Sequence, residues 1–87
     1  MNNVWEIGKN YFIRTVTMHH VGRLEQITEK EIVLSGASWV ADSGRFHVAL
    51  KTGLLDEVEV FVNPVIINRD ALVDATVWDH DLPTVSK

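Results

Sequence analysis

The stretch NYFIRTVTMHHVGRLEQIT, residues 10–28, decides the fold. Its first half is rich in β-branched and aromatic residues, a composition that favours strands. Gly22 follows within the same apolar pattern, and a glycine inside a strand pattern is typical of a bend or a bulge. The stretch therefore predicts two strands that meet at Gly22, or one long strand that bends there. We expect Gly22 to adopt a positive φ, which glycine tolerates better than any other residue.

The residues that follow predict a third strand, after which the spacing of the apolar residues changes from that of a strand to that of a helix. A short polar turn leads into EIVLSGASWV, residues 31–40, which has the composition of a strand. The apolar residues then switch to helical spacing, which predicts a helix over about residues 43–52. Asp42 or Ser43 is a candidate for its N-terminal cap, and Gly53 is the candidate for its end.

Two further strand patterns follow the predicted helix. EVEVFV, residues 57–62, alternates between apolar and polar residues, and Pro64 indicates a bend or a sheet edge directly after it. VIINRDALVDATVW, residues 65–78, predicts a strand, a tight turn at residues 68–70 and a final strand. About five short strands around one small core indicate a mainly β protein, a small closed or partly open barrel with one inserted helix.

The length and composition set the outer limits. The chain has 87 residues, enough for one small domain, which we place at residues 1–82, and we expect residues 83–87 to form a flexible tail. Without cysteine, neither a disulfide nor a thiolate metal site can form. No apolar run approaches the ~18 residues of a membrane span, and the N-terminal residues lack the pattern of a signal peptide. We expect a cytoplasmic protein with no membrane partner, in the host cytoplasm if the chain is viral.

The charge balance disfavours strong non-specific DNA binding. The chain carries 12 acidic and 8 basic residues, a formal net charge of −4, whereas nucleic-acid domains usually present a basic surface to the phosphates. A local basic patch is still compatible with this balance. Arg45 at the start of the predicted helix and Arg69 in the loop between the last two strands are the candidates to line a pore or a cleft.

No motif in the sequence predicts an enzyme or a metal site. We find no nucleophile elbow, no phosphate-binding glycine loop and no His-Glu-x-x-His, so we expect a non-enzymatic protein without a cofactor. His19 and His20 are adjacent on a strand and therefore point to opposite faces, so both cannot easily bind the same metal ion. If they act, base stacking or a pH-dependent charge is the expected role. The contiguous residues 79–81, Asp-His-Asp, are expected to be solvated.

The large apolar side chains predict self-association. We expect Trp39 to pack the helix onto the barrel. In the last strand Val73, Ala75 and Val77 share one face, and we assign that face to the core. This assignment leaves three large apolar side chains outside as a candidate oligomer interface: Phe61, Leu72 and Trp78. Exposed apolar groups mark interfaces and a free edge strand needs cover, so we expect a homo-oligomer, and head-to-tail pairing that closes would make it a ring.

Two segments resemble the Sm-like family, the small SH3-like barrels that form RNA-binding rings and include the Hfq-like proteins of bacteria. VTMHHVGRLEQITEKEIVLSGA resembles the first motif of the family: an apolar strand leads to Gly22-x-Leu24, then to a polar turn, an apolar run and a small residue, Ala37. VIINRDALVDA resembles the second motif, with two apolar runs around a tight polar turn.

The resemblance covers residues 11–40 and 58–78, and the chain departs from the family at several points. Thr28 lies near the place of the acidic residue after the second strand. The turn of the second motif keeps an arginine, Arg69, but lacks the glycine, and the Lys-His pair of the bacterial members is absent. The predicted helix lies between the third and fourth strands and not at the N-terminus.

The resemblance implies a non-enzymatic ring that binds single-stranded RNA or nucleotides. The residues that would contact RNA are His19, His20, Arg45 and Arg69, by base stacking and by charge. Two alternatives stay open. The first is an assembly or adaptor protein without a nucleic-acid ligand, such as a phage structural or host-modulating protein, which would suit the compact form of the chain. The second is an oligomer that sequesters a small ligand at its subunit junctions.

Overall fold

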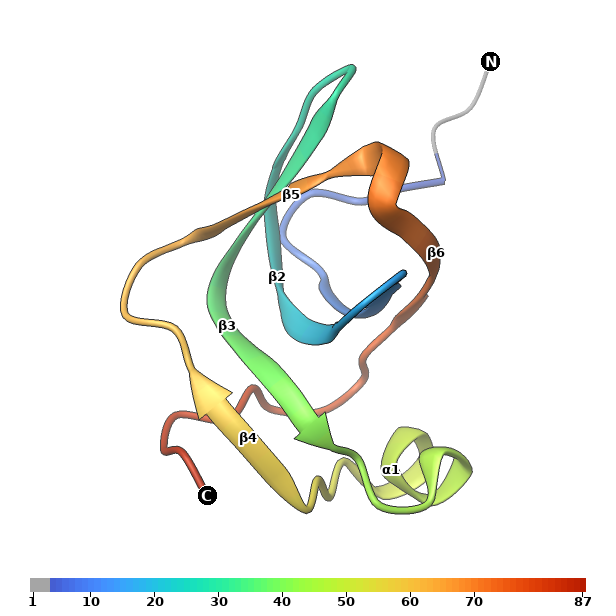
Figure 1. The fold of residues 1–87 in the computed structure, drawn as a ribbon, viewed down its shortest axis with the longest axis vertical. Coiled ribbons are helices and arrows are strands. Elements are labelled where there is room, and N and C mark those ends of the chain that lie inside the picture. The colour runs from blue at the N-terminus through green and yellow to red at the C-terminus, as the bar shows by residue number, and fades with distance from the viewer. Residues whose placement is uncertain (1–3) are drawn as a thin grey trace.

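The structure is a computed structural model that describes residues 4–87; residues 1–3, which we assigned to the domain, lie outside this range. The described chain is mainly β with one short helix, as predicted (Figure 1). Its elements are, in chain order, β1 (Asn10–Thr15), β2 (His19–Ile27), β3 (Glu31–Asp42), α1 (Phe46–Thr52), β4 (Glu57–Val60), β5 (Val65–Asn68), the 3-10 helix η1 (Arg69–Ala71) and β6 (Leu72–Val77).

The six strands form one curved antiparallel sheet. Its order is β4-β3-β2-β1-β6, and β5 pairs with the first half of β3 while β4 pairs with the second half. The interruption predicted near Pro64 separates β4 from β5, and the described chain has six strands where about five were expected. The sheet is not closed by hydrogen bonds, because β6 pairs with β1 alone and β5 with β3 alone among the described strands. The helix η1 joins these two edges (Figure 1).

Gly22 lies inside β2 and not at a strand junction. The chain reverses earlier, at residues 16–18, where the Thr15 N–H donates to the Met18 carbonyl at 2.8 Å. The pairing of β2 with β3 shifts register next to Gly22, as expected for a bulge. The expected positive φ is wrong, since four other glycines have positive φ values and Gly22 does not. Close packing explains the glycine instead: an added Cβ would lie 3.0 Å from the Cβ atoms of both Ala37 and Leu34.

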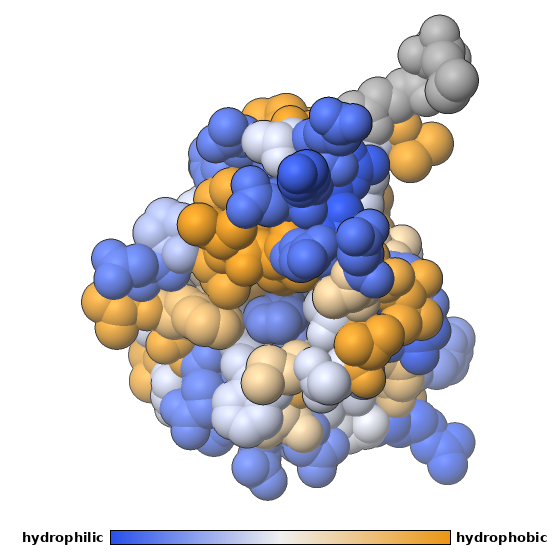
Figure 2. Space-filling model, turned by 45° about the horizontal axis from the view of Figure 1, so that its top comes forward, coloured by the Kyte–Doolittle hydropathy of each residue, from blue (hydrophilic) through white to orange (hydrophobic). Residues whose placement is uncertain are grey.

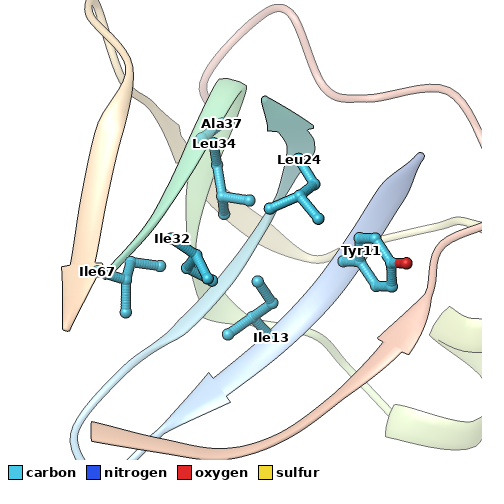
Figure 3. Close-up of a cluster of buried hydrophobic side chains, with 7 residues drawn as sticks. All are labelled: Tyr11, Ile13, Leu24, Ile32, Leu34, Ala37 and Ile67. Carbon is cyan, nitrogen blue, oxygen red and sulfur yellow. The ribbon is translucent and has the colours of Figure 1, made fainter. Parts of the chain in front are cut away.

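The sheet buries apolar side chains on both faces. Tyr11 and Ile13 of β1 point to what we call the inner face, and Phe12 between them points to the outer face. Figure 3 shows the inner cluster, which lies within the curve of the sheet and consists of Tyr11, Ile13, Leu24, Ile32, Leu34, Ala37 and Ile67. The outer cluster consists of Phe12, Val21, Val40, Ala49, Leu55, Val58 and Trp78, and partly buried residues of α1 and Leu82 pack against it.

The helix α1 covers part of the outer face. It begins at Phe46, three residues later than predicted, because Asp42 accepts a hydrogen bond from the Gly44 N–H at 2.8 Å and holds these residues in a turn. Arg45 takes the N-cap position without a side-chain hydrogen bond. The predicted end of the helix is confirmed, since Gly53 has a φ of 79° and its N–H donates to the Ala49 carbonyl.

The residues after β6 return across the molecule to β4. Lys87 exchanges two backbone hydrogen bonds with Val58, with N···O distances of 2.8 and 2.9 Å. The predicted flexible tail, residues 83–87, therefore has a docked position in the structure, and its flexibility stays a prediction. Within residues 4–87 no helix is long and apolar enough to cross a bilayer.

Candidate functional site

The two free edges of the sheet carry exposed apolar side chains. On β6, Val73 is 60% exposed and Val77 is partly exposed, although both belong to the face that we assigned to the core. On β5, Ile66 is 64% exposed, and Val62 just before it is also exposed. An edge strand offers unpaired N–H and C=O groups, and apolar side chains beside them make it a template for another strand. These two edges are the strongest candidate site in the described chain.

A shallow apolar groove runs beside the β6 edge. It has a volume of about 440 Å³ and is lined by Val4, Trp5, Tyr11, Ala75, Thr76 and Val77. The rings of Trp5 and Tyr11 both line it, with centroids 5.1 Å apart. The Tyr11 hydroxyl accepts a hydrogen bond from the Glu6 N–H at 2.8 Å, which fixes the N-terminal residues against the sheet. The β6 edge is thus continuous with a preformed apolar surface.

The predicted interface residues are not the exposed ones. Trp78 is 2% exposed, and its ring packs against Phe12 at a centroid distance of 5.8 Å. Phe61 and Leu72 are partly buried against the inner cluster. The expectation that Trp78 lies outside was wrong because it assumed that only one face of the sheet is covered, whereas Phe61 and Leu72 keep part of their surface exposed and their interface role stays a prediction. The curve of the sheet covers the inner face, while α1 and the residues after β6 cover the outer face.

The two histidines lie on opposite faces of β2. His19 packs edge-on against Phe12, with centroids 5.8 Å apart, and His20 stacks on Phe61 at the same distance. His20 is only 6% exposed, and its Nδ1 atom has no hydrogen-bond partner. Burial, and to a smaller degree the neighbouring His19, holds the pKa of His20 below its ordinary value. His20 is therefore neutral at pH 7 and closed to a stacking base.

Trp39 is an exposed aromatic residue that the sequence interpretation placed elsewhere. It pairs directly with His20 of β2 and with Glu59 of β4, and it is 39% exposed. It does not belong to the outer cluster, so the expected packing against the helix was wrong. Directly paired residues on neighbouring strands share a face, so Trp39 lies on the inner face beside His20. Side chains alternate between the two faces along a strand, so the position of the neighbouring Val40 in the outer cluster indicates that Trp39 points to the inner face.

The candidate arginines lie at opposite ends of the molecule. Arg69 begins η1, and Arg45 directly precedes α1 at the other end (Figure 1). The Arg69 guanidinium donates to the Thr28 carbonyl at 2.6 Å, so it holds the β2–β3 turn against η1. The structure therefore does not bring together His19, His20, Arg45 and Arg69 into one surface.

Three other cations of the described chain, Lys9, Arg14 and Arg23, are paired with carboxylates. Arg14 hydrogen-bonds to both carboxylate oxygens of Asp74, and its guanidinium lies over the ring of Phe46. Ion pairs also join Lys9 to Glu6, at 3.0 Å, and Arg23 to Glu25, at 3.3 Å. Each pairing reduces the positive charge that is available to a phosphate backbone.

The acidic residues around His80 do not converge with it as a set of metal ligands in the described chain. His80 Nε2 lies 2.8 Å from the Leu50 carbonyl, which ties residues 79–81 to the end of α1. Among the described residues no three histidine, aspartate or glutamate side chains converge as metal ligands. An open hollow of about 650 Å³ lies beside them, lined by Asn10, Thr52, Gly53, Trp78, Asp79, His80 and Asp81.

Comparisons with protein-family models, with curated proteins and with solved structures found no match to this chain.

Proposed function

We propose that the protein is a non-enzymatic assembly module that joins copies of itself through its two free sheet edges. The β6 edge of one copy pairs with the β5 edge of the next. The exposed β6 strand with Val73 and Val77 along it carries the proposal, because unpaired N–H and C=O groups beside apolar side chains form a ready template for another strand. We also propose that the curved sheet is an Sm-like barrel in which the fourth strand is split into β4 and β5.

The geometry of the edges favours a head-to-tail contact. Each copy has two different free edges, on β5 and on β6, so one copy can bind a neighbour on each side. A contact between two different surfaces is heterologous, and it gives a closed ring when the rotation between copies closes. On the face seen in Figure 2, hydrophobic areas are separated by hydrophilic ones. On that face, such a distribution suits narrow contacts better than one broad face-to-face contact.

Charge favours assembly without nucleic acid over the RNA-binding ring. Every added copy contributes a formal charge of −4. The elements that carry the two candidate arginines, α1 and η1, lie at opposite ends of the folded molecule. A uridine-rich or adenine-rich oligonucleotide at low salt should therefore leave fluorescence anisotropy unchanged. Salt-dependent binding that Arg69→Ala weakens would favour the RNA-binding ring instead.

Charge substitutions at the two edges test the proposed assembly. By light scattering at micromolar concentration, the wild-type chain should have a mass several times 9.8 kDa. Val73→Lys on β6 and Ile66→Glu on β5 should each disperse the assembly, because a charge at an edge blocks strand pairing. Leu54→Lys, an exposed residue between α1 and β4, is the matched control and should assemble normally.

Mixing the two edge variants tests the head-to-tail arrangement. The β5 edge of the Val73→Lys variant and the β6 edge of the Ile66→Glu variant are both intact, and the two altered edges carry opposite charges. The mixture should therefore regain assembly that neither variant shows alone. If Ile66→Glu assembles normally while Val73→Lys does not, the contact joins β6 to β6. A wild-type mass of 9.8 kDa at every concentration rejects assembly altogether.

A further inference from the structure

The outer edge of β4 is occupied by the C-terminal segment of the same chain. Val58 and Lys87 exchange both backbone hydrogen bonds, which is the pattern of an antiparallel strand pair. One step along, the Val60 N–H donates to the Ser86 side-chain oxygen at 2.9 Å. The segment of residues 84–87, which we call the arm, therefore satisfies the outward N–H groups of Val58 and Val60.

The arm is held by few contacts, and the residue that anchors it lies before it. Leu82 packs against the outer cluster and is partly buried. The arm itself is exposed, with Val85 74% exposed, and the structure assigns no helix or strand to residues 78–87. A groove of about 310 Å³ between Leu55, Val58 and the residues from 81 to 87 accompanies it. Three hydrogen bonds and this shallow groove make the arm separable from the body of the domain.

We propose that the β4 edge is a strand-docking site that exchanges its own arm for the arm of a second copy. The occupant is a second copy because the structure already shows that this sequence fits this edge. A reciprocal exchange between two copies preserves every hydrogen bond of the arm, so its main free-energy cost is that of association. The tethered arm has an effective concentration of about millimolar, so the chain's own arm dominates in dilute solution and exchange rises with concentration.

This exchange is independent of the edge pairing proposed above. It uses β4 and residues 84–87, whereas the proposed assembly uses β5 and β6. Either contact can form without the other, and their tests have separate readouts. In an assembly held through β5 and β6, the local concentration of arms is high, so exchange would reinforce the contacts between neighbouring copies.

Engineered cysteines test the exchange cleanly because the chain has none of its own. The antiparallel pairing of Lys87 with Val58 places Ser86 opposite Glu59, and both side chains are exposed. The full-length variants Glu59→Cys and Ser86→Cys are unfolded together, refolded together and held in a glutathione redox buffer. Glu59→Cys mixed with Lys51→Cys, an exposed position on α1, reports random collisions. Circular dichroism confirms that each variant is folded.

We expect several-fold more cross-linked heterodimer from Glu59→Cys with Ser86→Cys than from the control pair, and a yield that rises with protein concentration. The chain that carries both cysteines should form an intrachain disulfide when dilute. The same excess should persist in a Val73→Lys background, because exchange does not use β6. A heterodimer yield no higher than that of the control pair, at every concentration and after joint refolding, overturns the exchange. The Ser86→Cys substitution removes the hydroxyl that accepts from Val60 but leaves both Val58–Lys87 backbone hydrogen bonds, so failure of the double variant to form an intrachain disulfide overturns the backbone docking of the arm.

Discussion

Replacing Gly22 by alanine should destabilise the protein. The same substitution stabilises a protein where the backbone accepts alanine and the new Cβ has free space. Gly22 is buried in β2, and its φ is not in the left-handed region, so the backbone itself accepts alanine. At such a site alanine stabilises by about 0.4–1 kcal/mol, because it restricts the unfolded chain. Here the new Cβ would lie 3.0 Å from two Cβ atoms and 3.2 Å from the Ala37 Cα, all on β3.

These contacts set the expected magnitude. Overpacking of a well-filled core costs about 1–3 kcal/mol. After the gain of about 0.4–1 kcal/mol from the unfolded chain is subtracted, the net loss in the free energy of unfolding spans about 0–2.6 kcal/mol, and the two 3.0 Å contacts favour about 1–2 kcal/mol within that range. For a domain of this size such a loss lowers the melting temperature by roughly 4–16 °C. Gly22→Val should lose more, because its two extra methyl groups enter the same space.

Urea unfolding followed by tryptophan fluorescence measures this loss, with all variants at one protein concentration because association changes apparent stability. Ala37→Gly removes one of the two Cβ atoms in contact, so Gly22→Ala should cost less in that background than in the wild type. Ala41→Gly, an exposed position on the same strand, should give no such relief. An alanine variant as stable as the wild type, or more stable, would refute close packing as the reason for the glycine.

Two further predictions concern His20 and Trp78. Because burial holds the pKa of His20 below its unfolded value of about 6.5, the unfolded state binds more protons as the pH falls below that value, and stability declines. In thermal melts from about pH 7.5 to about pH 5.5, His20→Phe should remove this part of the decline in melting temperature. The control His47→Phe, at an exposed site on α1, should not remove it. An unchanged pH dependence of the melting temperature in His20→Phe would contradict the role of burial. Trp78→Ala should cost about 3–5 kcal/mol in the free energy of unfolding, measured in urea, because it empties the outer cluster; a loss under about 1 kcal/mol would show that Trp78 is not a core residue.

Local patterns along the chain were sufficient for the elements. The β-branched and aromatic runs predicted the strands, and the change to helical spacing predicted α1 between β3 and β4. Gly53 was predicted as the end of the helix because a left-handed residue there closes the last turn, and its φ of 79° confirms this. These features depend on neighbours within a few residues.

The assignment of faces was not predictable in the same way. Alternation in β6 separates Val73 and Val77 from the opposite face, but it does not say which face is covered. That depends on α1 and on the residues after β6, which pack on the outer face from distant parts of the chain. The prediction therefore buried the wrong alternate residues and exposed Trp78.

The relative positions of the candidate site residues could not be predicted for the same reason. Arg45 directly precedes α1 and Arg69 begins η1, and nothing in their spacing showed that the sheet would hold them at opposite ends of the molecule. The adjacency of His19 and His20 did predict opposite faces, because side-chain direction on a strand is a local property. The Sm-like resemblance and RNA binding stay predictions.

The position of β6 has a consequence for synthesis on the ribosome. The strand β1 lies between β2 and β6 in the sheet, yet β6 is made roughly 60 residues after β1. At about 5–20 residues per second, one side of β1 waits about 3–12 s for its partner. During that time Phe12 also lacks Trp78 on the outer face, so the nascent chain exposes both an open strand and a large apolar side chain. The early hairpin of β1 and β2 therefore keeps an unpaired strand edge until β6 is made, and slower translation of the last third of the chain should lengthen that exposure.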